Sequence, residues 1–438
     1  MNLAVSRFRF CLAILLFTAS LVGAYGEPAR VLIIDGRNNH DWRSTTDHLR
    51  AILEATGQFK VEVSTAPQLR FPKVPSRVKR AEDQSALIEA RKHFEKPQAK
   101  AKADLEPQWA TWTPAFASAE VVVMNYNGDH WPAELGKAFV KFVRSGGGVV
   151  LVHGSNNAFR NWPEFSEMIG LGWRPALIGK AIKVDADTGE TFVAENAELP
   201  NSGNSGHGSK HAFQVTVRAP EHPIMKGLPP VWMHARDELY HNMRGPAKNL
   251  TVLSSAYSDP KQRGSGMHEP LTWEVEYGKG RVIVTSMGHL WRGDMERGQQ
   301  AALQCVGFQT IFARACEYAA TGEVTLGVPD GFPGPEEIHV VPPHAVAWDG
   351  NLTEVLGARE SMQTKKATDP YCMLTPEEEL ATFEIAPGYV AELFASEPMV
   401  QEPVLTVWDA DGAMYVAEMR SYMQDVEGTG TKTLRNGR

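Results

Sequence analysis

Cysteine is scarce in this sequence: there are four in 438 residues, and one of them, Cys11, lies close to the N-terminus. The other three, Cys305, Cys316 and Cys372, are too few and too unevenly spaced for a disulfide framework. We expect Cys305 and Cys316 to be buried as small apolar side chains. Because no cysteine occurs between Cys11 and Cys305, a site built from the intervening segments cannot use a thiol nucleophile.

The sequence also lacks an excess of positive charge. Its formal net charge is -8, and its only basic run extends from about residue 77 to residue 102. A nucleic-acid partner is therefore not expected, because such proteins carry basic patches or stripes. Hydrophobic residues make up 43% and charged residues 22% of the chain, which is typical of a folded protein with more than one domain.

Long apolar runs are missing except near the N-terminus. There, Arg7 and Arg9 precede an apolar stretch, and small residues follow up to Gly26. This layout predicts a secretory signal peptide over residues 1–26, and hence a periplasmic or secreted protein without a membrane span after cleavage. An uncleaved anchor is the alternative, although the stretch is short for a bilayer span of about 20 residues.

Short apolar runs alternate with helix-like segments over most of the chain. The runs 31–34, 121–124, 149–152 and 280–285 predict buried strands, and segments such as 132–147 and 299–321 predict helices. This alternation predicts an α/β fold with a doubly wound, mostly parallel sheet. Residues 330–382 are rich in proline and predict a linker, and residues 383–438 predict a short all-β stub.

Several of these strands end in histidine or a carboxylate: His40 and Asp41, Asp129 and His130, His153, and His289. Because the carboxyl ends of parallel strands meet at one edge of a sheet, these side chains are expected to form a site. We predict His153 and His289 as catalytic acid–base groups, with Glu238 or Asp237 as their partner. Asp237 and Glu238 are adjacent, so on a strand only one of them can face the site.

Other polar and aromatic residues near these strand ends are predicted to bind the substrate. They are His40, Asp41, Asn127, Asp129, Ser155, Asn156, His268 and Trp291. Three tryptophans, Trp162, Trp232 and Trp291, could form a sugar-stacking floor or fill the core, and the core is the favoured interpretation. A divalent metal stays open as a cofactor, although the histidine spacing matches no zinc signature such as HExxH.

Six motifs in this order carry a resemblance to a known family: DGRNNHDW, NYNGDHWP, GGGVVLVHGSNNAF, HARDELYHNM, HEPLTWEVEYGKGRV and TSMGHLW. Together they resemble the ThuA-like (trehalose utilisation) domain, which implies the class I glutamine amidotransferase-like, flavodoxin-like fold over residues 27–329. In amidotransferase relatives the corresponding turn carries a catalytic cysteine, whereas here that position is His153. Glutaminase activity is therefore not expected, and Ser155 lacks the GxSxG frame of a serine nucleophile.

The resemblance implies a role in carbohydrate utilisation, with trehalose or an oxidised disaccharide as substrate. The histidines and carboxylates at the strand ends predict acid–base chemistry on that substrate. A non-catalytic sugar-binding module attached to a dehydrogenase and a metal-dependent hydrolase stay open as alternatives. Residues 383–438 resemble the first blade of a β-propeller in membrane-bound, haem-containing dehydrogenases. This implies a longer protein with dehydrogenase and haem domains as partners, but no haem in this chain.

Overall fold

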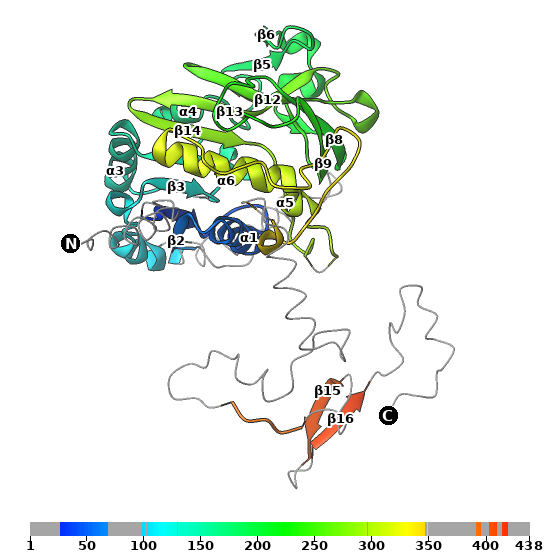
Figure 1. Ribbon diagram of the computed structural model, residues 1–438. Coiled ribbons are helices and arrows are strands. Elements are labelled where there is room, and N and C mark those ends of the chain that lie inside the picture. The colour runs from blue at the N-terminus through cyan, green and yellow to red at the C-terminus, as the bar shows by residue number, and fades with distance from the viewer. Residues whose placement is uncertain are drawn as a thin grey trace, which may run out of the picture. The chain divides into compact units, whose positions relative to one another are not determined.

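A computed structural model shows two compact units, residues 1–352 and 353–438 (Figure 1). It describes residues 27–68, 99–100, 103–128, 130–295, 297–346, 348, 391–395, 403–409 and 414–418. The predicted signal peptide, most of the basic run, Asp129, Cys372 and most of the predicted linker lie outside the described residues. None of the helices in the described ranges is long and apolar enough to cross a membrane.

The central part of the main sheet is parallel. In pairing order its strands are β2 (Phe59–Thr65), β1 (Ala29–Asp35), β3 (Val121–Met124), β4 (Gly148–Val152) and β14 (Gly280–Thr285). Apart from the edge strand β2, these strands are largely buried, as the apolar runs predict. Their carboxyl ends therefore lie along one edge of the sheet.

The sheet continues from β14 with antiparallel strands. In pairing order these are β13 (His268–Tyr277), β12 (Leu250–Tyr257), β8 (His211–Val217) and β9 (Val231–Asp237). Shorter strands attach beside them: β5 (Lys180–Val184), β6 (Thr191–Ala194) and β11 (Arg244–Gly245). A separate two-stranded pair joins β7 (Gly206–His207) to β10 (Tyr240–His241).

Helices cover both faces of the parallel strands (Figure 1). One face packs against α1 (Trp42–Ala55) and α6 (Val306–Thr321), and the other against α3 (Ala133–Arg144) and α4 (Pro163–Ile169). Successive side chains of β1 point to opposite faces of the sheet. Ile33 packs in the core on the side of α1 and α6, and Ile34 in the core on the side of α3 and α4. The predicted doubly wound α/β fold with a parallel centre is confirmed.

Short helical segments occupy several connections. They are η2 (Phe116–Ser118), η3 (His153–Asn157), η4 (Asn196–Glu198), η5 (Pro200–Gly203), η6 (Pro260–Gln262), η7 (Pro343–Ala345) and the one-turn α5 (Ala301–Gln304). The predicted single helix 299–321 is divided at Cys305, whose backbone is extended and forms a bridge with Val340. Cys305 and Cys316 are free and buried, as expected.

The first unit extends beyond Pro329, where we expected it to end. The backbone amide of Val306 donates to the carbonyl of His339 over 3.0 Å, and Val346 and Trp348 are buried in the core beside α1 and α6. The proline-rich segment up to Trp348 is therefore packed on the α/β domain. Proline content predicted the lack of regular structure but not these contacts.

The second unit contains an antiparallel pair, β15 (Pro403–Trp408) and β16 (Met414–Glu418). The pair agrees with the prediction of an all-β segment. Leu405, Trp408 and Tyr415 in these strands are each more than half exposed.

Candidate functional site

His40 lies in the loop after β1. Its Nδ1 atom is 3.2 Å from Oδ1 of Asn38, and the same oxygen accepts the backbone amide of His40 over 3.2 Å. The side chain is buried. The next residue, Asp41, caps α1 by accepting a hydrogen bond from the amide of Ser44. The loop thus turns His40 inward and uses Asp41 to begin the helix.

His153 follows directly after β4 with a backbone φ of 43°, in the left-handed region. A side chain other than glycine adopts this conformation only at some cost, and such residues cluster at functional sites. Its Nδ1 atom lies 2.6 Å from the carbonyl oxygen of Ser286. The following Gly154 allows His40 to come close, because a Cβ there would lie 2.6 Å from Nδ1 of His40.

Asp237 is the last residue of β9 and Glu238 follows it, and their side chains point in different directions, as their adjacency predicts. Asp237 is fully buried, and its carboxylate accepts hydrogen bonds from the backbone amides of Gly288 and His289 over 2.8 and 3.2 Å. Glu238 faces the cavity, and its Oε1 lies 3.2 Å from Nε2 of His289. Asp237 therefore supports the site, while Glu238 is part of its surface.

Four of these side chains converge, and we call them the histidine–glutamate cluster: His40, His153, Glu238 and His289. One nitrogen or oxygen atom from each lies within 4.8 Å of the others. The ring centres of the three histidines are 4.8 to 5.2 Å apart. Three of the members follow the carboxyl ends of parallel strands, and the fourth, Glu238, directly follows the antiparallel strand β9.

Burial and neighbouring groups shift the pKa values of His40, Glu238 and His289. Burial lowers the pKa of His40 far below its usual value, and the neighbouring His153 and His289 lower it further. Burial and then His153 also lower the pKa of His289, to about 4. Burial opposes ionisation of Glu238, but interactions with His153 and His289 outweigh it and hold the pKa of Glu238 below its usual value. At neutral pH, His40 and His289 are therefore neutral beside an ionised carboxylate.

The cluster lies at the base of a cavity of about 520 Å³. The lining residues are Asn39, His40, Gly154, Asn157, Trp173, His207, Lys210, Glu238, Tyr240, His289 and Trp291. The hydroxyl of Tyr240 lies 2.7 Å from Nε2 of His153, and burial raises the pKa of Tyr240 well above its usual value. Tyr240 is therefore a protonated donor beside the cluster.

Some predicted substrate-binding residues line this cavity and others lie elsewhere. His40 and Trp291 line it, with their ring centres 5.3 Å apart. Asn127 lies behind it, where its side-chain amide donates to Asn39 over 2.8 Å. Asp129 lies outside the described residues.

The remaining four predicted residues, which include Asp41, do not line the cavity. Ser155 is buried and donates to the carbonyl of Met124, and Asn156 is completely buried. His268 contacts Arg218 and Ser255 on the antiparallel part of the sheet. With Asp41, these side chains stabilise the fold around the site.

The sequence analysis did not identify several cavity residues, including Asn157, Trp173, His207, Lys210 and Tyr240. Tyr240 belongs to the motif that contains Glu238, two residues further on, and a strand alternation would have placed both on one face. Trp173, His207 and Lys210 come from a region without clear periodicity, so no local signal marked them. Of the three tryptophans considered, Trp232 is completely buried and Trp291 lines the cavity.

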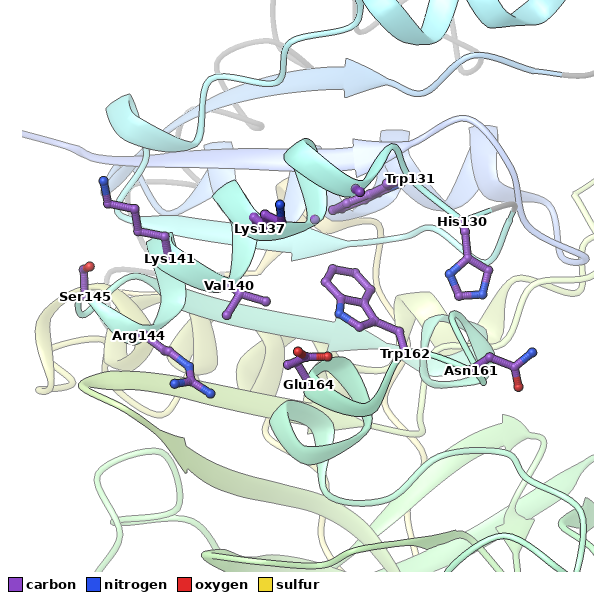
Figure 2. Close-up of a pocket in the computed structure, with 12 residues that line it drawn as sticks. His130, Trp131, Lys137, Val140, Lys141, Arg144, Ser145, Asn161, Trp162 and Glu164 are labelled. Atoms are coloured by element: carbon purple, nitrogen blue, oxygen red, sulfur yellow. The ribbon is translucent and has the colours of Figure 1, made fainter. Parts of the chain in front are cut away.

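A second, larger pocket of about 750 Å³ lies along α3 (Figure 2). His130 and Trp162 border it, together with the exposed basic side chains of Lys137, Lys141 and Arg144 on α3. His130 was expected to join the other strand-end histidines, but its ring packs 5.6 Å from Phe159 instead. This pocket contains no member of the histidine–glutamate cluster.

Comparisons with known proteins agree with this architecture. A model of the ThuA family, described as trehalose utilisation, matches residues 76–319. A ThuA-like protein from Parabacteroides merdae has a similar structure with 32% identity and a TM-score of 0.57, covering 73% of this chain and 99% of that one. A ThuA-like protein from Bacteroides uniformis is 16% identical with a TM-score of 0.38, covering 68% of this chain and 95% of that one.

The end of the chain matches a different family model. Residues 375–438 match a domain of unknown function, DUF7133. No curated protein matches the chain.

Proposed function

Because the chain belongs to the ThuA (trehalose utilisation) family, we propose that it is an enzyme that converts a carbohydrate in the cavity above the histidine–glutamate cluster. The substrate is trehalose or a related, oxidised disaccharide. The observation that carries the proposal is the position of a carboxylate and buried imidazoles beside a half-open cavity that aromatic side chains line. Such cavities are the usual sites of small-molecule chemistry.

The walls of the cavity suit a sugar. Trp173 packs edge-on against Tyr240, with ring centres 4.8 Å apart, and Trp291 is 43% exposed. Aromatic rings of this kind offer apolar faces for the C–H groups of a pyranose, while their polar edges stay hydrated. The volume of about 520 Å³ falls within the range of ~300–1,000 Å³ that is usual for ligand sites.

The reaction that these groups support is polar chemistry at a carbon–oxygen bond. Glu238 supplies a negative charge and Tyr240 a hydroxyl proton, and both groups lie near Nε2 of His153. Among the described residues no cysteine reaches the cavity, because Cys305 and Cys316 are buried in the core on the α6 side of the sheet. Proton transfer and hydrolysis both fit this arrangement.

A turnover assay tests the proposal. The purified full chain is incubated with trehalose and with oxidised disaccharides, and products are followed by chromatography. We expect turnover by the unchanged protein and a loss of at least ~100-fold in Glu238→Gln, which keeps the shape of the side chain but removes its charge.

His268→Ala is the matched control, because His268 lies outside the cavity, and it should retain activity. Binding of the disaccharide without any turnover would contradict the proposal and favour a sugar-binding module. Equal turnover in Glu238→Gln and in the unchanged protein would show that the carboxylate of the cluster does not take part in the reaction.

A further inference from the structure

We propose that the histidine–glutamate cluster binds one divalent transition-metal ion, through the Nε2 atoms of His40, His153 and His289 and the carboxylate of Glu238. The proposal of a bound metal depends on the contacts of these four side chains. The role of that metal in catalysis rests on the proposed function.

The first argument is that the other nitrogen of each histidine faces an acceptor. Nδ1 lies 2.6 Å from the carbonyl oxygen of Ser286 in His153 and 3.2 Å from Asn38 Oδ1 in His40. In His289 it lies 3.9 Å from a carboxylate oxygen of Asp294. A carbonyl oxygen can only accept, so Nδ1 of His153 carries the proton and its Nε2 keeps a lone pair.

The same tautomer follows for His40. Asn38 Oδ1 also accepts the backbone amide of His40, which identifies this atom as the amide oxygen, so Nδ1 of His40 donates to it. Histidines that bind metals usually donate their second ring nitrogen to a carbonyl, amide or carboxylate in this way. The surroundings therefore prepare the Nε2 atoms as ligands.

The second argument is the spacing of the ligand atoms. Glu238 oxygens lie 3.2 Å from Nε2 of His289 and 3.7 Å from Nε2 of His153. Neighbouring ligands of a tetrahedral ion with bonds of about 2.0–2.1 Å are about 3.4 Å apart. Even the widest separation in the cluster, 4.8 Å, exceeds this by only about 1.4 Å, which small rotations of the side chains can close.

The third argument concerns groups that lack a partner. Nε2 of His289 is buried and makes no hydrogen bond within the described part of the chain. The ion pairs of Glu238 in the described residues involve only histidines, and the nearby Lys210 is already paired with Asp294. A positive ion between Nε2 of His289 and the carboxylate of Glu238 would satisfy the lone pair of the nitrogen and balance the charge of the carboxylate.

The ligand set indicates the class of metal. Three imidazoles and one carboxylate suit zinc and its first-row neighbours better than calcium or magnesium, which prefer oxygen ligands. His40, Glu238 and His289 all line the cavity, so a substrate oxygen can approach an ion held there. Such an ion polarises a bound carbonyl or hydroxyl group.

Zinc titration tests the proposal. The full chain without an affinity tag is stripped with a chelator, and binding of ZnCl₂ is measured by calorimetry. We expect one equivalent of zinc to bind, and each of His40→Ala, His153→Ala and His289→Ala to weaken binding at least ~100-fold. His268→Ala is the control and should bind zinc as the unchanged protein does.

Unchanged zinc binding in a His40→Ala/His289→Ala double variant, or no binding by the unchanged protein, would overturn the proposal. Cobalt provides a second readout that does not depend on how the variants fold. The unchanged protein with one equivalent of Co²⁺ should show visible d–d absorption that zinc removes by competition, and a spectrum identical to free Co²⁺ would also overturn the proposal.

The activity measurement separates this inference from the proposed function. If zinc-loaded protein shows no turnover, the proposed function is contradicted but the metal site is not. If chelator-stripped protein shows full turnover, the metal has no role in catalysis, but the proposed function is not contradicted.

Discussion

The carboxylate of Asp237 accepts a hydrogen bond from the backbone amide of His289 over 3.2 Å. It accepts a second one from Gly288 over 2.8 Å, and its other contacts include Nε2 of His234 at 2.8 Å. Glu238 follows Asp237 directly. The buried carboxylate of Asp237 thus holds two members of the cluster in place. His289 follows the parallel strand β14, and Glu238 follows the antiparallel strand β9.

Replacing Asp237 by asparagine should loosen this arrangement. An amide offers one acceptor atom where the carboxylate offers two, so buried donors lose their partner. We expect the free energy of unfolding to fall by about 2–3 kcal/mol and zinc binding to weaken by ~10–100-fold, as measured by urea unfolding and calorimetry.

Asp259→Asn is a suitable control for this variant. Asp259 accepts the amide of Lys261 in a surface turn, so its replacement should leave zinc binding unchanged. A folded Asp237→Asn protein with undiminished zinc affinity would show that Asp237 does not position the cluster.

Removing the hydroxyl of Tyr240 should tighten metal binding. The hydroxyl donates to Nε2 of His153 over 2.7 Å, and a metal must displace it from that atom. Since one hydrogen bond contributes about 1 kcal/mol net, Tyr240→Phe is expected to bind zinc ~5-fold more tightly. Its turnover should fall, because the proton donor is lost. Weaker zinc binding in this variant would instead indicate that the phenol is itself a ligand.

The buried pair of Lys183 and Glu269 stabilises the backbone at Asn242, two residues after Tyr240. Lys183 contacts Glu269 and donates to Oδ1 of Asn242, and the backbone amide of Asn242 donates to Glu269. Breaking such a pair from one side leaves an uncompensated charge, so Lys183→Met should lose about 3–5 kcal/mol of stability. The double variant with Glu269→Leu should recover most of that loss, as chemical unfolding can show.

The effect of Lys183→Met should depend on pH. Burial raises the pKa of Glu269, and the charge of Lys183 opposes that rise. A carboxyl group with a raised pKa in the folded state contributes stability at low pH and loses it as pH rises through the folded value. Without Lys183 the rise is larger, so the difference in melting temperature from the unchanged protein should grow from about pH 5 to about pH 8. A difference that shrinks with rising pH would contradict this assignment.

Two truncations test where the first unit ends. A chain that stops after Leu352 keeps Val346 and Trp348 in the core, whereas one that stops after Pro329 exposes the surface that they cover. Burial of a large apolar side chain contributes about 1.5–3 kcal/mol, so the shorter chain should melt at a clearly lower temperature. Equal melting temperatures by calorimetry would mean that residues 330–352 add nothing to the fold.

Local sequence patterns were enough to predict the parallel centre and three members of the cluster. The apolar runs before His40, His153 and His289 are short and sharply bounded, and parallel strands bring their carboxyl ends together whatever their order in the sheet. Because parallel strands end at one edge of the sheet, the convergence of these three histidines could be predicted without knowing the conformations of the loops.

Glu238 was predicted only as an alternative to Asp237, and Tyr240 was not predicted. Both residues follow β9, which joins the site through antiparallel pairings between segments far apart in the chain, such as β12 with β8. No local period encodes such pairings. His130 shows the reverse error, since it follows a parallel strand, yet aromatic packing against Phe159 turns it toward α3.

Anomalous diffraction from a crystal soaked with zinc and a disaccharide tests the account most directly, because it locates the ion and the sugar together. We expect one zinc peak at about 2.0–2.2 Å from Nε2 of His40, His153 and His289 and from Glu238, with sugar density above it beside Trp291. Zinc bound elsewhere, or sugar found only in the pocket along α3, would contradict the account.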